Sequence, residues 1–155
     1  MGDPMYLTAE GAARLRIELA ELKGTGRDDL AKRLRSAIQM GDLSENADYH
    51  AAKEQQGFLE GRIQELEYLL KNAIIVESVR GSREVVDIGA YVTVQEDDFD
   101  PETFQMVGVK EADSLNQKIS NDSPFGRALM GGRVGDEVIP LTPRGEIHLK
   151  ILKIE

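Results

Sequence analysis

Gly41-Asp42-Leu43-Ser44-Glu45-Asn46-Ala47-Asp48-Tyr49-His50 is the stretch that decides the fold. It is an acidic turn between two long runs in which apolar residues recur every three or four positions, the spacing of an amphipathic helix. Because a short turn joins these runs, they are predicted to fold back on each other as an antiparallel hairpin. Asp42 and Glu45, three residues apart, then lie at its tip.

The run that follows the turn has the more regular spacing. Its seam alternates steps of three and four residues over three heptads, the pattern of a coiled coil, and consists of Ala52, Gln55, Leu59, Ile63, Leu66, Leu70 and Ala73. The run before the turn starts near Thr8, a residue suited to capping a helix. Since thirty helical residues rise about 45 Å, the two runs predict a thin rod that projects beyond a compact domain.

Gly24-Thr25-Gly26 interrupts the first run. Two glycines in three positions cost roughly 2 kcal/mol relative to alanine in a helix interior. Thr25 followed by Asp28 resembles a capping box, which would restart a helix. The sequence therefore predicts a kink or break at this point, within one domain.

The periodicity changes to that of strands from about residue 80. Strands are predicted at 91–95, 103–107, 137–139 and 147–154, with an acidic turn over 96–101. Ser123-Pro124 is typical of the start of a short helix, and Gly131-Gly132 of its end. The fold class is thus α+β, with an antiparallel α-helical coiled-coil hairpin over 1–78, its acidic tip near 41–48, and a small α+β domain over 79–155.

The composition of the 155-residue chain narrows the classes of function. Hydrophobic residues make up 41%, enough for a packed core, whereas a net charge of -9 argues against a broad nucleic-acid-binding surface. The absence of cysteine excludes disulfides and cysteine-ligated zinc. No apolar run approaches the ~18 residues of a membrane span, and Met1-Gly2-Asp3-Pro4 lacks the features of a signal peptide. A cytoplasmic protein without a membrane partner is expected.

The acidic pair at the tip has two interpretations. Asp42 is suited to be the N-cap of the second helix with Glu45 at the third position of a capping box, and local pattern favours this structural role. Alternatively, the two carboxylates hold a hard divalent cation such as Mg²⁺, which takes oxygen ligands. Two carboxylates leave most of the coordination sphere open, so the remaining ligands would come from a partner and its phosphate substrate.

The basic residues near the tip also have two interpretations. They flank the turn on both arms and are Lys32, Arg33, Arg35 and Lys53. They are either solvated helix charges or contacts to a nucleic-acid backbone beside the acidic pair. Nothing nearby orients His50 as a general base, and Tyr49 is expected to pack across the neck of the hairpin.

The tip sequence resembles that of the bacterial Gre transcript cleavage factors, of the GreA type. The resemblance extends over nearly the whole chain and is carried by the segments 41–58, 60–63, 7–11, 107–108, 111–113 and 119–131. It implies that the second domain is FKBP-like and docks on the rim of the secondary channel of RNA polymerase. The hairpin would then pass down that channel to the polymerase active site.

The resemblance also implies roles for individual residues. Asp42 and Glu45 would be the catalytic tip acids, which hold a Mg²⁺ shared with the polymerase, without any tightly bound cofactor. Arg35 and Lys53 would contact the 3′ end of the nascent RNA, although Ile38 stands where relatives often carry Arg. The residues that would dock on the polymerase are Asn121, Asp122, Ser123 and Pro124. The protein is expected to be a monomer.

The chain has three candidate functions. The favoured one is an accessory elongation factor, not an enzyme, that stimulates the polymerase to cleave backtracked transcripts. A Gre-like channel-binding inhibitor without cleavage activity is expected to have an altered tip, whereas this chain keeps both Asp42 and Glu45. An FKBP-like prolyl isomerase needs an apolar proline pocket, and the second domain offers only Tyr91, Phe99, Phe104 and Phe125 as aromatics.

Overall fold

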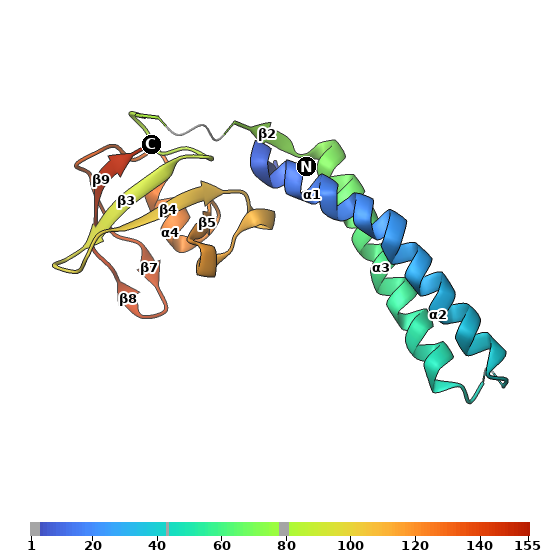
Figure 1. Ribbon diagram of the computed structural model, residues 1–155. Coiled ribbons are helices and arrows are strands. Elements are labelled where there is room, and N and C mark those ends of the chain that lie inside the picture. Colours follow the sequence, from blue (N-terminus) through green and yellow to red (C-terminus); the bar gives the residue numbers. More distant parts are fainter. Residues whose placement is uncertain (1–3, 43, 78–80) are drawn as a thin grey trace. The chain divides into compact units, whose positions relative to one another are not determined.

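The computed structural model describes residues 4–42, 44–77 and 81–155. It divides into two compact units, one formed by Ala13–Asn72 and the other by Met1–Ala12 together with Ala73–Glu155. The first is a helical hairpin and the second is rich in strands, so the predicted α+β class is confirmed (Figure 1). The predicted domain boundary at residue 78 lies outside the described residues, as do residues 1–3 and Leu43 of the tip.

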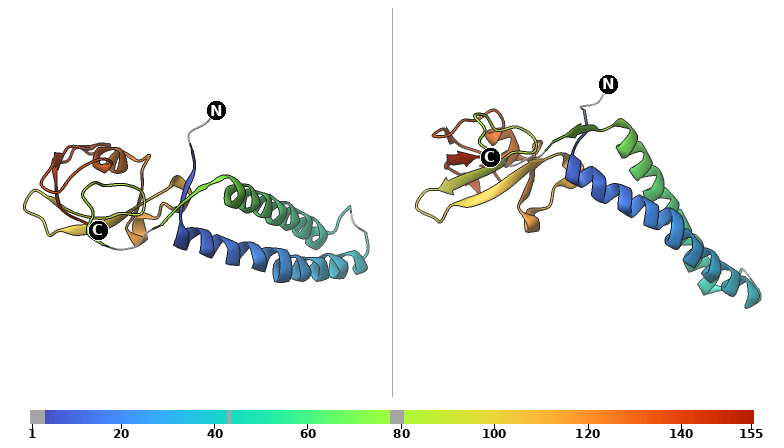
Figure 2. Two further views of the ribbon diagram at one scale, coloured as in Figure 1. Left: turned by 90° about the horizontal axis from the view of Figure 1, so that it is seen from above. Right: turned by 45° about the horizontal axis from the view of Figure 1, so that its top comes forward.

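The hairpin has one interrupted arm and one continuous arm. The first arm comprises α1 (Ala9–Glu21), a π-helical turn (Leu22–Gly26) and α2 (Arg27–Gln39). The second arm is the single helix α3 (Ala47–Asn72). The arms lie side by side in opposite directions in all three views (Figures 1 and 2), which confirms the predicted antiparallel hairpin.

Aliphatic side chains fill the seam between the arms. Those buried are Leu30 and Ala37 of α2 and Ala52, Ile63, Leu66 and Leu69 of α3. The predicted seam was wrong at Gln55, which is exposed and accepts a hydrogen bond from Arg33 of the other arm. It was also shifted by one position at its end, where Leu69 is more buried than Leu70. An α-helix drifts by about 20° per heptad relative to a 3.5-residue repeat, so the buried stripe moves around α3.

The chain does not break at the Gly24-Thr25-Gly26 interruption. The residues on either side keep right-handed helical angles, with φ -64° and ψ -43° at Glu21 and φ -65° and ψ -41° at Arg27. Among the described residues no side chain caps the start of α2, so the predicted capping box of Thr25 and Asp28 is wrong. Because the helix continues as a π turn, it leaves no free N–H groups for a cap.

Ion pairs join the arms on the outside of the seam. Arg62 of α3 donates from Nε and Nη2 to the two carboxylate oxygens of Glu18, at 2.9 and 3.0 Å. Arg27 binds Glu60 in the same two-pronged way, at 2.9 Å for both contacts. These hydrogen bonds raise the pKa of Arg27 and lower that of Glu60. The charged contacts therefore add to the buried seam in holding the two arms in register.

Replacing Arg62 with Met is expected to destabilise the hairpin by about 0.5–1 kcal/mol, because its side chain is 40% exposed and solvent screens the pair. Denaturant unfolding at low salt and in 1 M NaCl measures the effect, which should shrink in the high-salt series. Arg16, exposed on α1, is the matched control, and Arg16→Met is expected to change little. An equal cost at both salt concentrations would contradict an electrostatic origin.

The strand-rich unit is built on a five-stranded sheet in the order β5-β4-β3-β9-β6. Its strands are β3 (Tyr91–Glu96), β4 (Glu102–Val107), β5 (Lys118–Ser120), β6 (Glu137–Val138) and β9 (Leu149–Ile154). Neighbouring strands are antiparallel except β4 and β5. The four predicted strands are thereby confirmed, whereas β5 and the small hairpin of β7 (Leu141–Thr142) and β8 (Gly145–Glu146) were not predicted.

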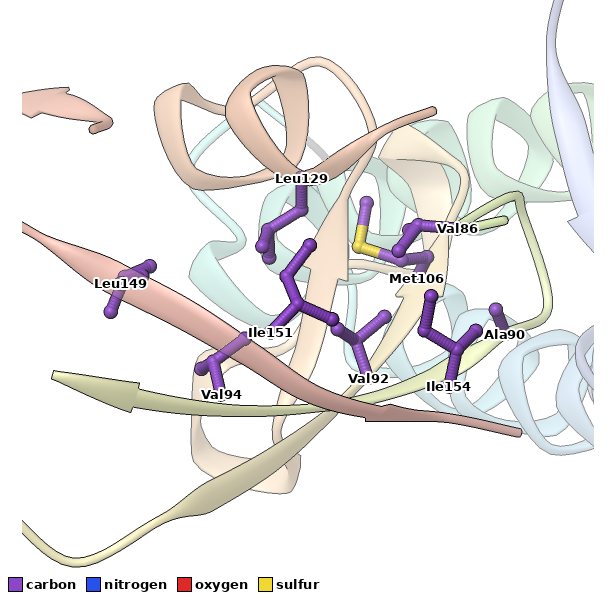
Figure 3. Packing of buried hydrophobic residues seen from close by; sticks show 9 residues of the cluster. All are labelled: Val86, Ala90, Val92, Val94, Met106, Leu129, Leu149, Ile151 and Ile154. Atoms are coloured by element: carbon purple, nitrogen blue, oxygen red, sulfur yellow. The ribbon is translucent and has the colours of Figure 1, made fainter. Parts of the chain in front are cut away.

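The core of this unit lies between the sheet and helix α4 (Pro124–Leu129). Leu129 of α4, Ile151 of β9 and Met106 of β4 are fully buried, and their side chains gather on one side of the sheet strands (Figure 3). Val92 of β3 completes the contact from below in the same view. The short helix therefore has a fixed position on the sheet, and so does the loop that leads into it.

A parallel pair of short strands forms where the hairpin begins and ends. β1 (Tyr6–Thr8) pairs with β2 (Ile74–Val76), with Tyr6 opposite Ile74. Thr8 caps α1 as predicted, since its hydroxyl oxygen accepts the N–H of Gly11 at 3.0 Å. The Glu111 carboxylate in turn accepts the Thr8 N–H at 2.6 Å and its hydroxyl at 2.7 Å. The first turn of α1 is thus held by a residue about a hundred positions away.

Candidate functional site

The first arm ends at a glycine. The N–H of Met40 bonds to the carbonyl of Ala37 at 3.1 Å, and that of Gly41 to the carbonyl of Ile38 at 3.3 Å. Gly41 has φ +113°, a backbone conformation that residues with a Cβ rarely adopt. Gly41 therefore ends the helix, as its position in the sequence predicted.

Asn46, not Asp42, caps the second arm. Helix α3 begins at Ala47, and the Oδ1 atom of Asn46 accepts the N–H of Tyr49 at 3.0 Å. This is the N-cap contact to the third residue of a helix. The predicted capping box of Asp42 and Glu45 is therefore wrong, because the turn is longer than the one assumed. An Asn directly before the helical pattern is the signal in the sequence that could have identified the cap.

Asp42 organises the turn instead. Its Oδ1 atom accepts the hydroxyl of Ser44 at 2.8 Å and the N–H of Ser44 at 3.0 Å. Both hydrogen bonds stabilise the ionised carboxylate and so hold the pKa of Asp42 below its usual value. The Ser44 hydroxyl has the larger effect and the Ser44 N–H the smaller one. Asp42 is fully ionised at neutral pH, and its side chain is exposed to solvent.

Glu45 is the freer of the two acids. Its side chain is exposed, and within the described residues its carboxylate makes no hydrogen bond or ion pair. Asp48 is also exposed, in the first turn of α3. In the described part of the chain, no group of three or more His, Cys, Asp or Glu side chains is arranged to hold a metal ion. The tip thus offers exposed carboxylates that leave most of a cation's coordination sphere to other ligands.

Replacing Ser44 with Ala is expected to raise the pKa of Asp42 toward its usual value, because the hydroxyl donor is lost. Carboxyl chemical shifts followed by NMR from pH 2 to 6 would measure this. Since the folded pKa is depressed, the contact stabilises the turn above the unfolded pKa, and the contribution is lost as pH falls through the folded pKa. An unchanged Asp42 titration in the variant would contradict the hydrogen bond.

The basic residues assigned to RNA contact are exposed. Arg35 lies on α2, and Lys53 lies on α3, where its ammonium donates to Gln56 at 3.0 Å. Ile38 occupies the end of α2 and is 50% exposed, so an apolar side chain stands in the part of the arm nearest the tip. The two residues assigned to RNA contact therefore come from different arms, Arg35 from α2 and Lys53 from α3.

The residues assigned to docking form the loop between β5 and α4. Ser123 caps α4, because its hydroxyl accepts the N–H of Gly126 at 3.0 Å and donates to the carbonyl of Ser120 at 2.7 Å. Asp122 accepts a hydrogen bond from Arg127 at 2.8 Å and is exposed. The predicted helix start at Ser123-Pro124 is thereby confirmed.

Two hollows border this loop. One of about 450 Å³ is lined by Asn121 and Asp122 together with Tyr6 and Val109. Another, of about 510 Å³, is lined by the apolar Phe104, Ile119 and Phe125 together with polar residues that include Ser120 and Ser123. The docking residues thus lie on the strand-rich unit and the tip acids on the hairpin unit.

Two family models together match nearly the whole chain. The model for "Transcription elongation factor, N-terminal" matches residues 5–75, and that for "Transcription elongation factor, GreA/GreB, C-term" matches residues 81–155. The chain belongs to the GreA/GreB family of transcription elongation factors. The predicted membership of the Gre family is thereby confirmed, and with it the general function of a transcription elongation factor.

Individual members of the Gre family match over nearly their whole length. Transcription elongation factor GreA of Bacillus subtilis is 46% identical over 149 residues, 96% of this chain and 94% of its own. That of Geobacillus kaustophilus is 45% identical over 150 residues, 96% of this chain and 95% of its own. A solved structure of the transcription factor Gfh1 is 31% identical and covers 100% of this chain and 99% of its own, with a TM-score of 0.46.

None of the helices in ranges 4–42, 44–77 and 81–155 is both long and apolar enough to cross a bilayer.

Proposed function

We propose that this protein stimulates RNA polymerase to cleave backtracked transcripts, by bringing the tip of its hairpin to the polymerase active site through the secondary channel. The observation that carries the proposal is the pair of exposed carboxylates, Asp42 and Glu45, at the end of a two-helix rod. Helix α3 has 26 residues and is about 39 Å long. A rod only two helices thick enters a channel that a globular domain does not.

Asp42 and Glu45 would hold a Mg²⁺ ion together with groups of the polymerase. Their chemistry suits a hard cation, since Asp42 is ionised and Glu45 is unpartnered among the described residues. When bound, such an ion activates water and offsets charge in phosphodiester hydrolysis. Because Ser44 engages only one oxygen of Asp42, the other oxygen and the whole Glu45 carboxylate have no partner among the described residues and are available as ligands. The protein itself acts as an accessory factor and has no tightly bound cofactor.

The other assigned residues would serve binding. Arg35 and Lys53 would contact the phosphates of the RNA 3′ end, where a positive charge from each arm lies beside the acidic tip. The loop of Asn121, Asp122, Ser123 and Pro124 would dock on the rim of the channel. Its hydrogen bonds through Ser123 and its attachment to the core through α4 support this, because a preorganised loop loses less entropy on binding.

The decisive experiment uses stalled, backtracked polymerase with RNA labelled at its 5′ end. Adding this protein and Mg²⁺ is expected to shorten the RNA from its 3′ end and to restore elongation, whereas the protein without polymerase leaves the RNA intact. Slowed elongation without shortening would instead identify a channel-binding inhibitor. Cleavage of free RNA by the protein alone would overturn the accessory role. A proline-isomerisation assay with a short peptide tests the isomerase alternative, and no activity is expected.

A further inference from the structure

We infer that Asn46 is a positioning residue for the tip acids. Its side-chain amide ties together the two ends of the acidic turn and so determines where Asp42 and Glu45 are presented. The inference rests on the proposed function. It adds Asn46, which is not one of the two acids, to the residues on which the cleavage step depends.

The amide of Asn46 bridges the two arms. Its Nδ2 atom donates to the carbonyl of Ala37, in the last turn of α2, at 2.6 Å. Its Oδ1 atom accepts the N–H of Tyr49, in the first turn of α3, at 3.0 Å. The Ala37 carbonyl also accepts the N–H of Met40 at 3.1 Å, so the Asn46 amide occupies the second acceptor position of this oxygen. The first N–H groups of a helix lack intrahelical partners, and the same amide supplies one of them with an acceptor.

Both ends of the bridge are anchored. Ala37 is 2% exposed and belongs to the buried seam, and Asn46 is itself half-buried, in contrast to its exposed neighbours. The segment that the bridge closes runs from residue 38 to residue 45 and contains both tip acids. The hydrogen bond from Asn46 to Ala37 thus joins the two ends of the segment that contains Asp42 and Glu45.

A second set of contacts continues from the bridge to the acids. Ser44 donates two hydrogen bonds to Asp42, and the Nε2 atom of His50 lies 3.3 Å from the Ser44 carbonyl oxygen. The His50 ring also packs against Tyr49, with the ring centroids 5.6 Å apart. Asn46 caps the helix turn on which Tyr49 and His50 stand, so its contacts and those of Asp42 belong to one network.

Asparagine is the side chain suited to both contacts. It carries an acceptor and a donor on one short, planar group, whereas aspartate accepts only and serine is too short to reach across. Asn46→Asp keeps the cap on Tyr49 and the shape of the side chain, but it loses the donor to Ala37. Asn46→Ser keeps a cap without adding charge, and Asn46→Ala removes both contacts. The series separates the bridge from the cap.

The bridge matters because the two acids must meet ligands on another molecule. Reactions that depend on positioned groups lose roughly 100-fold in rate when a group is misplaced by about 1 Å. Asn46→Asp and Asn46→Ser are therefore both expected to lower the maximal cleavage rate, at saturating factor, by about 10- to 100-fold. The concentration of factor needed for half-maximal effect should stay within about twofold, because Asn46 does not belong to the docking loop. The half-saturating Mg²⁺ concentration should rise, because the displaced acids bind the ion less well.

The test measures these three quantities for the wild type and the three variants on backtracked polymerase, with thermal unfolding by circular dichroism as the check on folding. The order of the cleavage rates separates the two contacts. If the bridge to Ala37 determines the cleavage rate, Asn46→Ala should cleave no more slowly than Asn46→Ser, because both variants lack the bridge. Full cleavage rates and unchanged Mg²⁺ dependence in Asn46→Asp and Asn46→Ser would overturn the inference while leaving the proposed function in place. Failure of the wild type to stimulate cleavage would instead reject the proposed function.

Discussion

Asp42→Ala and Glu45→Ala are each expected to lower stimulated transcript cleavage by roughly 100-fold or more, the cost typical of removing one group that stabilises charge in a transition state. Each substitution removes a carboxylate that would share the metal ion, and no other group of the described tip replaces it. Cleavage of 5′-labelled RNA in backtracked complexes, at saturating factor and Mg²⁺, measures the loss.

The matched control is Asp48→Ala. Asp48 is an exposed acid in the same part of the hairpin, in the first turn of α3, so its removal changes net charge equally. Its cleavage rate is expected to stay within about twofold of the wild type, because no role of a metal ligand is assigned to it. The inactive variants should still compete with the wild-type protein for polymerase. Wild-type cleavage by the double variant of Asp42 and Glu45 would show that the mechanism proposed above is wrong.

Gly126→Ala is expected to destabilise the strand-rich unit by about 3 kcal/mol, at the upper end of the usual cost of overpacking. A Cβ at Gly126 would lie 1.8 Å from the carbonyl oxygen of Ser120 and 3.0 Å from the Cα of Asn121. Both are backbone atoms, which do not move aside as a flexible side chain would. The loop of the docking residues must therefore shift, or α4 must leave the core, and binding to polymerase should weaken in parallel.

Hydrogen exchange of the β3 and β9 amides measures the stability of this unit separately from that of the hairpin. Gly61→Ala is the control. Gly61 is an exposed residue inside α3 with no atom within 4 Å of an added Cβ, so alanine should raise helix stability by up to about 1 kcal/mol. If Gly126→Ala left the exchange of the sheet amides unchanged, the close approach of α4 to the Ser120 backbone would be disproved.

The elements that the sequence revealed are those with enough length to show a period. Helix α3, at 26 residues, and strands β3, β4 and β9, at six residues each, repeat their pattern several times. β1, β2 and β5 have three residues each, too few for an alternation to be recognised. They exist because they pair with a strand elsewhere in the chain, as β1 does with β2, where the N–H of Ile74 donates to the carbonyl of Met5 at 2.8 Å. Tertiary pairing of this kind leaves no local signal.

The errors at the tip and at the π turn have physical causes too. Asp42 and Asn46 are both good N-caps, and propensity alone does not say which one begins the helix. Asn46 also binds the carbonyl of Ala37 on the other arm, a contact between residues nine positions apart that supports its place at the start of the helix. The two glycines of Gly24-Thr25-Gly26 were predicted to kink or break the helix, but the helix continues through them. Packing of the arms against each other outweighs the cost of the glycines. The arms approach closely here, since a Cβ added at Gly26 would lie 3.4 Å from the Cδ1 atom of Leu59 on the other arm.

The π turn at Leu22–Gly26 has a consequence for how the length of the hairpin varies. A π turn contains about one residue more than a turn of α-helix. The first arm can therefore contain an extra residue at this point with little increase in its length. The distance from base to tip is therefore set by α3, which is uninterrupted, and the first arm adjusts to it. Loss of a single residue among Gly24, Thr25 and Gly26 should simply restore a regular helix. The loss of one residue within α3 would instead rotate every later seam residue by about 100° around the helix axis. The apolar side chains beyond the deletion would then no longer face the first arm.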